Sequence, residues 1–439
     1  MFAPLRSIAL HTLGCKLNFS ETSSIAQNLQ SQGFEVKKIK DLADIYVLNT
    51  CSVTENADKK CQDWVKKVKK QNPASKVVII GCFAQLKPNY IAKIKGVDAV
   101  FGAAEKFNLA QHLQSLKSAQ LPIVMNSNIK EVHHFTPAYS FGDRTRTFFK
   151  VQDGCNYFCS FCTIPLARGK SRSSNIEQTL IEMNKIDPMV KEVVLTGLNI
   201  GDFGFGTSEK FIDLIKAIEK EEFDKRFRIS SIEPNLLSDQ IIDFVSTSNY
   251  FVPHFHVPLQ SGNNEILHKM RRKYQTNLYR DTVQKIKNKM PNACIGVDVI
   301  VGFPGESESH FMDTYHFLND LEVDYLHVFP YSMRENTGAK KMKEQVPKNI
   351  KTKRASMLRI LSEKKKRKFY QSQQGKIVNV LFESENKDGK MHGFSENYIR
   401  VEHSFKEDWI GKVKSMELNQ LQTNMIFTSE NINPEVISK

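Results

Sequence analysis

Three cysteines on one short segment constrain this chain more than any other feature of its sequence. Cys155, Cys159 and Cys162 form a Cys-x3-Cys-x2-Cys group, here named the loop triad, directly after the strand-like run Thr147–Gln152. Three thiolates on one loop can bind three irons of a four-iron cluster. The fourth iron then has no protein ligand nearby and can bind a small molecule. The loop triad therefore predicts an iron–sulfur site with one open iron.

Two other uses of three cysteines fit less well. A structural zinc site is closed by four ligands, and this loop contains no fourth Cys or His. His133 and His134 lie some 20 residues before the triad and leave zinc as a minor alternative. A disulfide would leave an odd thiol and needs an oxidising compartment. The eight cysteines of the chain are also too few for a disulfide scaffold in 439 residues.

Length and charge narrow the class of protein. Hydrophobic residues make up 40% of the chain and charged residues 25%, as in ordinary globular proteins, and 439 residues suggest two or three domains. The 62 Lys and Arg outnumber the 48 Asp and Glu, and the net charge of +14 predicts a polyanionic partner such as nucleic acid. No apolar run is long enough to span a bilayer, and Met1–Gly14 lacks a signal-peptide pattern. We therefore expect a soluble, cytoplasmic protein with no membrane partner.

The first 115 residues alternate strand-like and helical patterns, which is typical of an open α/β sheet. The strand-like runs are Ser7–Leu13, Asp44–Leu48, Val77–Ile80 and Asp98–Phe101. The helical patterns between them are Ser20–Gln32, Ala57–Lys70 and Lys87–Lys95. Residues 116–140 show no clear periodicity and are predicted to form a linker.

Residues 141–339 repeat the alternation with six further strand-like runs, which predicts a partial TIM-like (β/α)6 barrel. These runs are Thr147–Gln152, Glu192–Thr196, Phe227–Ile232, His254–Val257, Cys294–Val301 and Val323–Phe329. Helical patterns separate them, for example Phe211–Glu222, Ile241–Thr247 and Thr276–Met290. The predicted fold class is a multidomain α/β protein.

A strongly basic segment follows the predicted barrel. Lys340–Tyr370 contains 13 Lys or Arg against two Glu. Met357, Leu358, Ile360 and Leu361 predict an apolar face, so residues 340–372 are expected to form a basic amphipathic helix that links two domains. Residues 373–439 contain short strand-like runs separated by turns. They predict a small, OB-like β-barrel.

Three other cysteines each follow a predicted strand of the first domain. Cys15, Cys51 and Cys82, here named the sheet triad, are 36 and 31 residues apart and match no local metal motif. The ends of parallel strands meet at one edge of an open α/β sheet, where ligands bind. We therefore expect the three thiols to lie together at a second site. Cys61 and Cys294 are expected only to pack in the core.

Polar residues follow the predicted barrel strands. In such barrels the reactive groups lie at the C-terminal ends of the strands, which places these residues beside the loop triad. The candidates for binding a small molecule there are Gly197, Asn199, Glu233, Gln260 and Asp298. His254 and His256 alternate on one strand and are interpreted as structural residues.

The loop triad, followed by Thr163-Ile164-Pro165 and Arg168-Gly169, resembles the radical S-adenosylmethionine superfamily. The resemblance implies that S-adenosylmethionine binds the open iron and is cleaved to a radical, while the protein positions the cofactor. The two triads together resemble the methylthiotransferase family over nearly the full chain. That family implies two [4Fe–4S] clusters held by the six cysteines. It also implies a C-terminal TRAM domain for tRNA binding, whose signature resembles Gly393–Tyr398.

Within this family the chain resembles the MtaB branch. The runs that carry the resemblance are Thr12–Asn18 with Glu21, Asn49–Thr54 and Thr196–Gly201. The branch implies methylthiolation of N6-threonylcarbamoyladenosine at tRNA position 37, with an external electron donor and a sulfur source.

Three alternatives to this activity remain. One branch of the family acts on isopentenyladenosine. Another acts on a ribosomal-protein aspartate and typically has Pro-Lys-Asn after its first cysteine, where Lys16-Leu17-Asn18 stands here. A non-catalytic iron–sulfur RNA-binding protein is an alternative of a different class. The open iron disfavours it, because a purely structural cluster normally takes four protein ligands.

Several residues are candidates for contacts with a tRNA anticodon stem-loop. The basic helix offers cations for phosphates, and the predicted β-barrel offers two rings on which bases can stack. These residues are Lys364, Lys365, Lys366, Arg367, Lys368, Phe394 and Tyr398. Arg168, Lys170 and Arg172, beyond the loop triad, are candidates for a cationic pocket that takes the carboxylate of the modified base.

Overall fold

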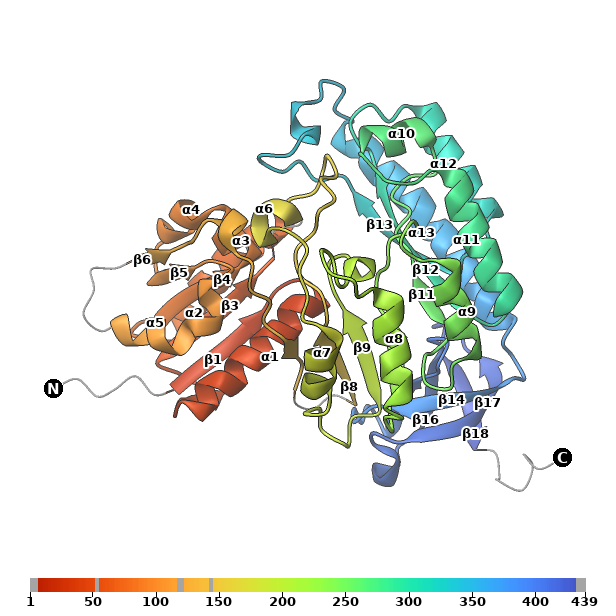
Figure 1. Cartoon of the computed structure of the whole chain (residues 1–439), viewed down its shortest axis with the longest axis horizontal. Coiled ribbons are helices and arrows are strands. Elements are labelled where there is room, and N and C mark those ends of the chain that lie inside the picture. Colours follow the sequence, from red (N-terminus) through yellow and green to blue (C-terminus); the bar gives the residue numbers. More distant parts are fainter. Residues whose placement is uncertain (1–6, 52–54, 117–121, 142–144, 432–439) are drawn as a thin grey trace.

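The computed structural model describes residues 7–51, 55–116, 122–141 and 145–431 of the chain (Figure 1). Three parts follow one another: a parallel sheet between helices, a second group of parallel strands with its own helices, and a small closed barrel of strands. In Figure 1 the first part is red to orange and the last is blue. None of the described helices is both long and apolar enough to cross a membrane.

Six parallel strands form the N-terminal sheet, in the order β2-β1-β3-β4-β5-β6. They are β1 (Ser7–Thr12), β2 (Glu35–Lys37), β3 (Ile45–Thr50), β4 (Lys76–Gly81), β5 (Ala99–Phe101) and β6 (Ile123–Met125). Every residue of β3 is buried, as is usual for a parallel strand with helices on both faces. The four strands predicted from apolar runs are all present.

Helices cover both faces of this sheet. They are α1 (Lys16–Ser31), α2 (Glu55–Gln71), α3 (Cys82–Leu86), α4 (Pro88–Ala92) and α5 (Leu109–Ser115), with the short 3-10 turn η1 (Glu105–Asn108) before α5. Ile25 of α1 and Leu113 of α5 pack on one face, and Val65 of α2 and Ile91 of α4 pack on the other. Because β2 and β3 flank β1, the strand order reverses at β1. Open α/β sheets bind ligands at such a point, outside the C-terminal ends of the strands.

The segment expected to be a linker, 116–140, supplies strands to two sheets. β6 pairs with β5 in the N-terminal sheet, and β7 (Ala138–Tyr139) pairs antiparallel with the first strand of the next sheet. The turn η2 (Ile129–Glu131) lies between them. Strands of two and three residues are too short to produce a periodic pattern, so the sequence could not reveal them.

Six parallel strands form the central part of the chain. They are β8 (Arg146–Lys150), β9 (Glu192–Thr196), β10 (Arg226–Ile229), β11 (His254–His256), β12 (Cys294–Val301) and β13 (Tyr325–Pro330). They belong to two sheets, β10-β9-β8-β7 and β11-β12-β13. A bridge between Ser231 and His256 connects the two, and the Ile232 N–H donates to the His256 carbonyl at 3.0 Å.

Helices surround these strands in the expected alternation. They are α6 (Ile164–Arg168), α7 (Ile176–Met183), α8 (Phe211–Lys220), α9 (Asp239–Thr247), α10 (Asn264–Lys269), α11 (Thr276–Lys289) and α12 (Glu308–Asp320), with the short turn η3 (Ile200–Asp202). Ile215, Val283 and Leu318 of three helices share one core with Phe227 and Val297 of the strands. Alternate side chains of the strands, such as Arg228 and His256, are not part of this core.

The basic helix α13 (Lys348–Gln371) packs against β13. It starts at Lys348, later than the predicted 340, because the turn η4 (Ala339–Lys341) and Pro347 precede it. Its buried apolar residues include Ala355, Leu358 and Leu361, whereas Ile360 is 53% exposed. The apolar face is therefore real, but Ile360 lies outside it.

Five strands close into a small barrel at the C-terminus. They are β14 (Ile377–Phe382), β15 (Lys390–Phe394), β16 (Arg400–Ser404), β17 (Val413–Leu421) and β18 (Phe427–Asn431), with the turn η5 (Glu407–Trp409). The closed order is β14-β15-β16-β18-β17, in which β16 and β18 run parallel and the other pairs antiparallel. Val380, Met391 and Phe427 fill the interior.

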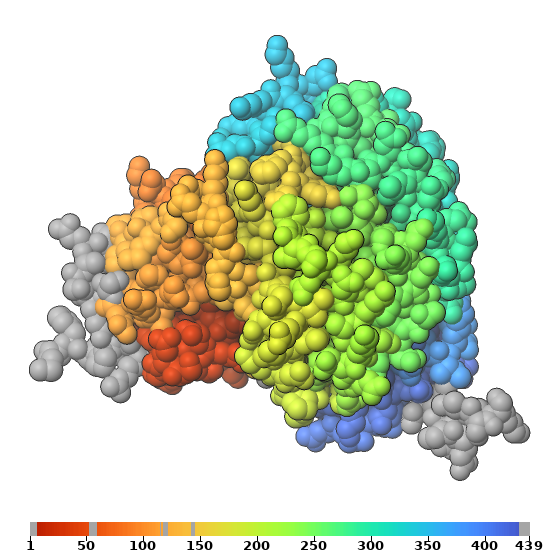
Figure 2. All heavy atoms as spheres, viewed as in Figure 1, coloured from red at the N-terminus to blue at the C-terminus, as the bar shows by residue number. Residues whose placement is uncertain are grey.

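The three parts touch one another directly. Helix α1 of the N-terminal part packs against β7 and β8, so the first sheet and the central strands lie side by side (Figure 1). On the face in Figure 2 the two parts form one continuous surface, with the C-terminal part below the central one. Arg226 of β10 donates to the carbonyl oxygens of Asn379 and Phe394, both at 2.9 Å, and so attaches the small barrel.

Candidate functional site

The loop triad lies between the end of β8 and the start of α6. Each of its sulfur atoms accepts a hydrogen bond from an N–H group. The donors are the backbone of Tyr157 to Cys155 at 3.3 Å, the Arg272 guanidinium to Cys159 at 3.1 Å and the backbone of Ile164 to Cys162 at 3.4 Å. Such donors stabilise thiolate ligands and tune the potential of an iron–sulfur cluster. The surroundings of the loop triad therefore fit a cluster.

Burial governs the protonation of these thiols. Together with the smaller effect of the neighbouring thiols of the triad, it raises the pKa of Cys155 and of Cys162 to about 12. Without metal the two groups are neutral at physiological pH, which makes them poor nucleophiles. Iron has to displace their protons on binding. The pKa values thus favour metal ligation over covalent catalysis by a free thiolate.

The sheet triad lies at the ends of three neighbouring strands. Cys15 precedes α1, Cys51 follows β3, and Cys82 is the first residue of α3 after β4. A Cβ atom on Gly14 would lie 2.5 Å from the Cys51 Cβ, so the backbone beside Cys15 passes directly against Cys51. Burial raises the pKa of the Cys15 thiol, which the nearby Arg168 lowers and Cys82 raises. The three cysteines thus lie near one another at the C-terminal edge of the sheet.

Arg168, on helix α6 just beyond the loop triad, contacts the sheet triad. Its Nε donates to the Cys82 sulfur at 3.2 Å, and its two terminal nitrogens bind both oxygens of Glu21 at 2.8 and 2.9 Å. It also donates to Asn18 at 2.5 Å and to Asp153 at 3.1 Å. Arg168 was expected in an open cationic pocket for substrate. The structure corrects this, because its side chain is buried and paired.

The buried ion pairs around Arg168 contain more cations than anions. Lys106 and Lys150 donate to Glu21 at 2.7 and 3.1 Å, and Lys150 and Arg172 donate to Asp153 at 3.2 and 3.1 Å. These cations hold the pKa of both carboxyl groups below the usual range, against the effect of burial. Four cations for two carboxylates leave positive charge beside the sheet triad. An anionic cluster on three thiolates is the kind of group that this charge would stabilise.

Arg172 and Lys170 also differ from the cationic pocket expected for them. The Arg172 guanidinium is taken up by Asp153 and by the backbone carbonyls of His134, Arg168 and Lys170. Lys170 is exposed on the surface. Neither side chain therefore offers a free cation inside the site, because Arg172 is paired with Asp153 and Lys170 is exposed to solvent.

The strand ends beyond the loop triad contain a cavity of about 240 Å³. Cys162, Gln260 and Asp298 line it together with apolar residues of β12 and β13. Gln260 has a positive φ of 68°, which is uncommon outside glycine and marks a constrained turn. Two of the five predicted ligand-binding residues thus lie beside a thiol of the loop triad.

The turn after β9 contains two more of the predicted residues. The Gln152 side-chain oxygen accepts hydrogen bonds from the backbone N–H groups of Leu198 and Asn199, both at 2.9 Å. A Cβ on Gly197 would lie 2.9 Å from that same oxygen, so the turn requires glycine there. Among the described residues, the buried Asn199 Oδ1 has no hydrogen-bonding partner. An unpaired buried acceptor is costly, so it fits a donor on a ligand.

Glu233, the fifth predicted residue, is paired with Arg272. Burial raises the pKa of the Glu233 carboxyl, and the adjacent guanidinium lowers it. Arg272 therefore bridges Glu233 and the Cys159 sulfur. It was not predicted, because Arg272 is 110 residues beyond the loop triad and no local pattern marks it.

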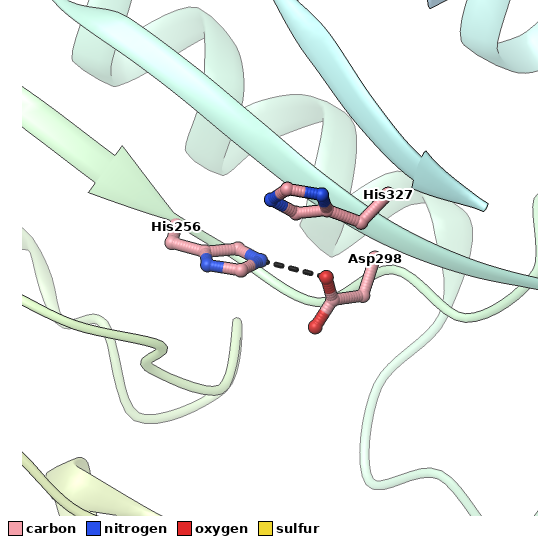
Figure 3. A group of neighbouring side chains, drawn as sticks. All are labelled: His256, Asp298 and His327. Carbon is pink, nitrogen blue, oxygen red and sulfur yellow. Dashed lines mark hydrogen bonds and ion pairs between the residues drawn. The ribbon is translucent and has the colours of Figure 1, made fainter. Parts of the chain in front are cut away.

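The inward faces of β11, β12 and β13 bring together His256, Asp298 and His327 (Figure 3). The His256 Nε2 lies 2.8 Å from the Asp298 Oδ1, and ligand atoms of all three residues lie within 4.8 Å of one another. His254 pairs with the Tyr325 hydroxyl at 3.0 Å. His254 and His256, which were expected to be structural, thus both have partners. His256 also lies beside the His327 imidazole.

The predicted RNA-binding residues fall into two groups. Lys364, Arg367 and Lys368 are exposed on α13. Lys365 instead donates to the backbone carbonyls of Asn319 and Leu321 at the end of α12, at 3.0 and 2.7 Å, and burial lowers its pKa to about 8. The Lys366 ammonium lies 5.2 Å from the centroid of the Tyr370 ring.

The two aromatic rings expected to stack on bases lie at an internal interface. Phe394 and Tyr398 stack on each other with centroids 4.9 Å apart. The Arg146 and Arg228 guanidinium groups lie 4.8 and 4.9 Å from the respective ring centroids. Both rings are only partly exposed. They hold the small barrel against the central strands, a role that only the tertiary structure could reveal.

Comparisons with known proteins agree with this site. Residues 7–102 match the Uncharacterized protein family UPF0004, and residues 149–318 match the Radical SAM superfamily. The Threonylcarbamoyladenosine tRNA methylthiotransferase MtaB of Bacillus subtilis is 36% identical over 94% of each chain. A tRNA-2-methylthio-N(6)-dimethylallyladenosine synthase of Lachnoclostridium phytofermentans is 32% identical over 94% of this chain and 92% of its own.

The fold of most of the chain also resembles that of a solved structure. The radical S-adenosylmethionine methyltransferase TsrM of Kitasatospora setae superposes with a TM-score of 0.54 at 13% identity, over 74% of this chain and 75% of that one. The chain belongs to the radical SAM methylthiotransferase family. Its cofactors are accordingly iron–sulfur clusters and S-adenosylmethionine, as the thiol surroundings already indicated.

Proposed function

We propose that this protein converts N6-threonylcarbamoyladenosine at tRNA position 37 to its 2-methylthio derivative. One observation carries the proposal: a relative that covers 94% of the chain at 36% identity is named for this activity. The contact between Cys82 of the sheet triad and Arg168, on the helix that follows the loop triad, supports it, because two iron–sulfur sites suit a reaction that needs both a radical and a sulfur atom. An external electron donor and a sulfur source would complete the reaction.

The chain's own residues would bind and orient the cofactors. The loop triad would hold one [4Fe–4S] cluster and the sheet triad a second. When bound, these clusters and S-adenosylmethionine supply a radical, a sulfur atom and a methyl group. Gly197, Asn199, Glu233, Gln260 and Asp298 would contact S-adenosylmethionine. The surrounding central strands, which we interpret as a partial (β/α)6 barrel, would keep water from the reacting atoms.

Replacing Glu233 with alanine is expected to weaken the binding of S-adenosylmethionine by about 1–3 kcal/mol, the usual loss for a charged hydrogen bond. The change also leaves Arg272 without its carboxylate partner. Calorimetric titration of the reconstituted protein measures the effect. Glu322, which is exposed, provides the control Glu322→Ala, whose affinity should equal that of the wild type. Equal affinity of both variants would remove Glu233 from the cofactor site.

We further propose that the C-terminal barrel is a TRAM domain of the OB type and works with α13 in binding tRNA. Its closed order with parallel β16 and β18 supports this. Cations on α13 would contact phosphates of the anticodon stem-loop. The proposed substrate is a cellular tRNA, so the cytoplasm is the proposed place of action.

Changing the exposed Lys364, Arg367 and Lys368 to glutamine is expected to flatten the salt dependence of tRNA binding. Each phosphate contact contributes about 0.7–0.9 to the log–log slope, so losing three contacts lowers the slope by about 2–3. Filter binding over a range of salt concentrations measures it.

A matched triple change of exposed lysines on and beside α8, at Lys210, Lys216 and Lys220, serves as the control for this experiment. It alters the net charge equally and should leave the slope close to that of the wild type. Similar slopes for both triple variants would mean that α13 does not contact the RNA.

The substrate is tested with tRNA stem-loops that carry each modification. With S-adenosylmethionine, reductant and sulfide, the protein should form the methylthio product on threonylcarbamoyladenosine and little on isopentenyladenosine. Mass spectrometry of the nucleosides identifies the product. Product on the isopentenyl stem-loop alone would assign the chain to the branch that acts on isopentenyladenosine. A ribosomal protein with the target aspartate is tested as the third substrate, and product on it alone would assign the chain to the branch that acts on that protein. Absence of product on all three, with intact clusters, would favour a non-catalytic RNA-binding protein.

A further inference from the structure

Lys16, the first residue of α1, extends from the N-terminal part into the interior of the central strands. Its ammonium nitrogen lies 5.8 Å from the centroid of the Phe148 ring on β8. The side chain is exposed to solvent, yet burial by the surrounding protein, followed by Arg228 and Arg146, lowers the pKa of its ammonium. A group that is both accessible and surrounded by protein lines a recess, here named the central recess.

Among the described residues, the Lys16 ammonium has no acidic partner, and its nitrogen takes part in no hydrogen bond or ion pair. The neighbouring Arg228 is paired with Glu192 at 3.0 Å, and the Asp298 carboxylate is hydrogen-bonded to the His256 ring at 2.8 Å. The Lys16 ammonium is therefore a cation of the central recess without a bonded carboxylate. Such an isolated cation favours an anionic ligand.

The central recess lies next to the cavity beside the loop triad, where S-adenosylmethionine is proposed to bind. Asp298 lines the cavity of about 240 Å³ that contains Cys162, and it lies within 4.8 Å of His327. His327 lines a second cavity, of about 420 Å³, together with Tyr325 and Tyr398. Burial lowers the pKa of His327, and the charges of His256 and then of Lys16 add to this effect, which places the Lys16 ammonium near the same wall. Figure 3 shows the His256, Asp298 and His327 side chains directed into one space from three elements.

We propose that Lys16 binds the carboxylate of an amino-acid substituent on the substrate base, within the central recess. His327 and the His256–Asp298 pair line the same space and offer hydrogen bonds to the other polar groups of that substituent. The proposal rests on the proposed function and specifies which chemical group of the substrate is recognised. A hydrocarbon substituent would leave the ammonium and the imidazole unpaired, and a site built for hydrogen bonds rejects a ligand that lacks them.

The test combines a change in the protein with a change in the substrate. Wild-type protein, Lys16→Gln and Lys16→Arg are compared on two stem-loops, one with threonylcarbamoyladenosine and one in which its carboxylate is replaced by a carboxamide. The wild type should prefer the carboxylate by about 10- to 100-fold in kcat/KM, the value of one charged hydrogen bond. Lys16→Gln should lose this preference, while Lys16→Arg should keep most of it. Lys216→Gln, on the outer surface of α8, should behave as the wild type.

The outcomes separate the two proposals. If Lys16→Gln discriminates between the substrates as strongly as the wild type does, the role of Lys16 is wrong and the proposed function stands. Equal activity of the wild-type protein on both substrates would overturn the carboxylate site without using any variant. A wild type that acts only on isopentenyladenosine would overturn the proposed function as well. Iron content and cleavage of S-adenosylmethionine, measured for each variant, show whether the neighbouring Cys15 still binds its cluster.

Discussion

Replacing the loop triad with alanine is expected to abolish reductive cleavage of S-adenosylmethionine and to remove about half of about eight irons per chain. In the proposed assignment its three thiols hold the cluster whose fourth, open iron binds the cofactor, and the N–H donors around them cannot hold a cluster alone. Alanine in the sheet triad should also remove about half of the iron. It should spare the cleavage and stop the formation of methylthio product. Iron analysis and detection of 5′-deoxyadenosine after anaerobic reconstitution measure these effects.

Two buried cysteines provide the control for the triads. Cys61 and Cys294 lie in the hydrophobic cores, as predicted. Cys61→Ala and Cys294→Ala should keep the full iron content and full cleavage activity, apart from a small loss of stability. A sheet-triad variant that also keeps full iron and full activity would show that the second cluster does not exist.

Replacing Arg168 with methionine is expected to destabilise the protein by about 3–5 kcal/mol, the cost of removing one partner from a buried ion pair. The change leaves Glu21 without the two hydrogen bonds from the guanidinium and Cys82 without its donor. Because Glu21 lies in the N-terminal part and Arg168 in the central part, contact between the two parts should weaken too. Denaturant unfolding of the apo protein measures the stability, and iron analysis measures the loss of the sheet-triad cluster.

Lys170→Met is the matched control, two residues away on the exposed surface. Surface changes of this kind usually shift the stability by less than about 0.5 kcal/mol. If Arg168→Met unfolds at the same denaturant concentration as Lys170→Met and keeps all its iron, the buried ion pairs do not join the two parts as described.

Local patterns in the sequence were enough to predict much of this protein. The spacing of the loop triad is contained within eight residues, and the sheet triad follows three apolar strands whose ends must meet at one edge. Strands such as β9 and β12 have the predicted bounds, because apolar runs flanked by turns specify buried parallel strands. Short strands were missed: β6 and β7 contain too few residues for a period to appear.

The pairing of charges was decided only by the tertiary structure. Arg168 and Glu21 are 147 residues apart, and Arg272 and Cys159 are 113 apart, so no periodicity relates them. The local sequence around a basic residue does not show whether its side chain contacts a phosphate, is buried against a carboxylate or caps a helix. In the folded chain Arg168 therefore pairs with Glu21, and Lys365 donates to backbone carbonyls at the end of α12. Among the described residues, Lys16 has no bonded partner in the central recess. These pairings depend on how the separately predictable parts of the chain pack together. The sequence pattern of each part carries no information about that packing.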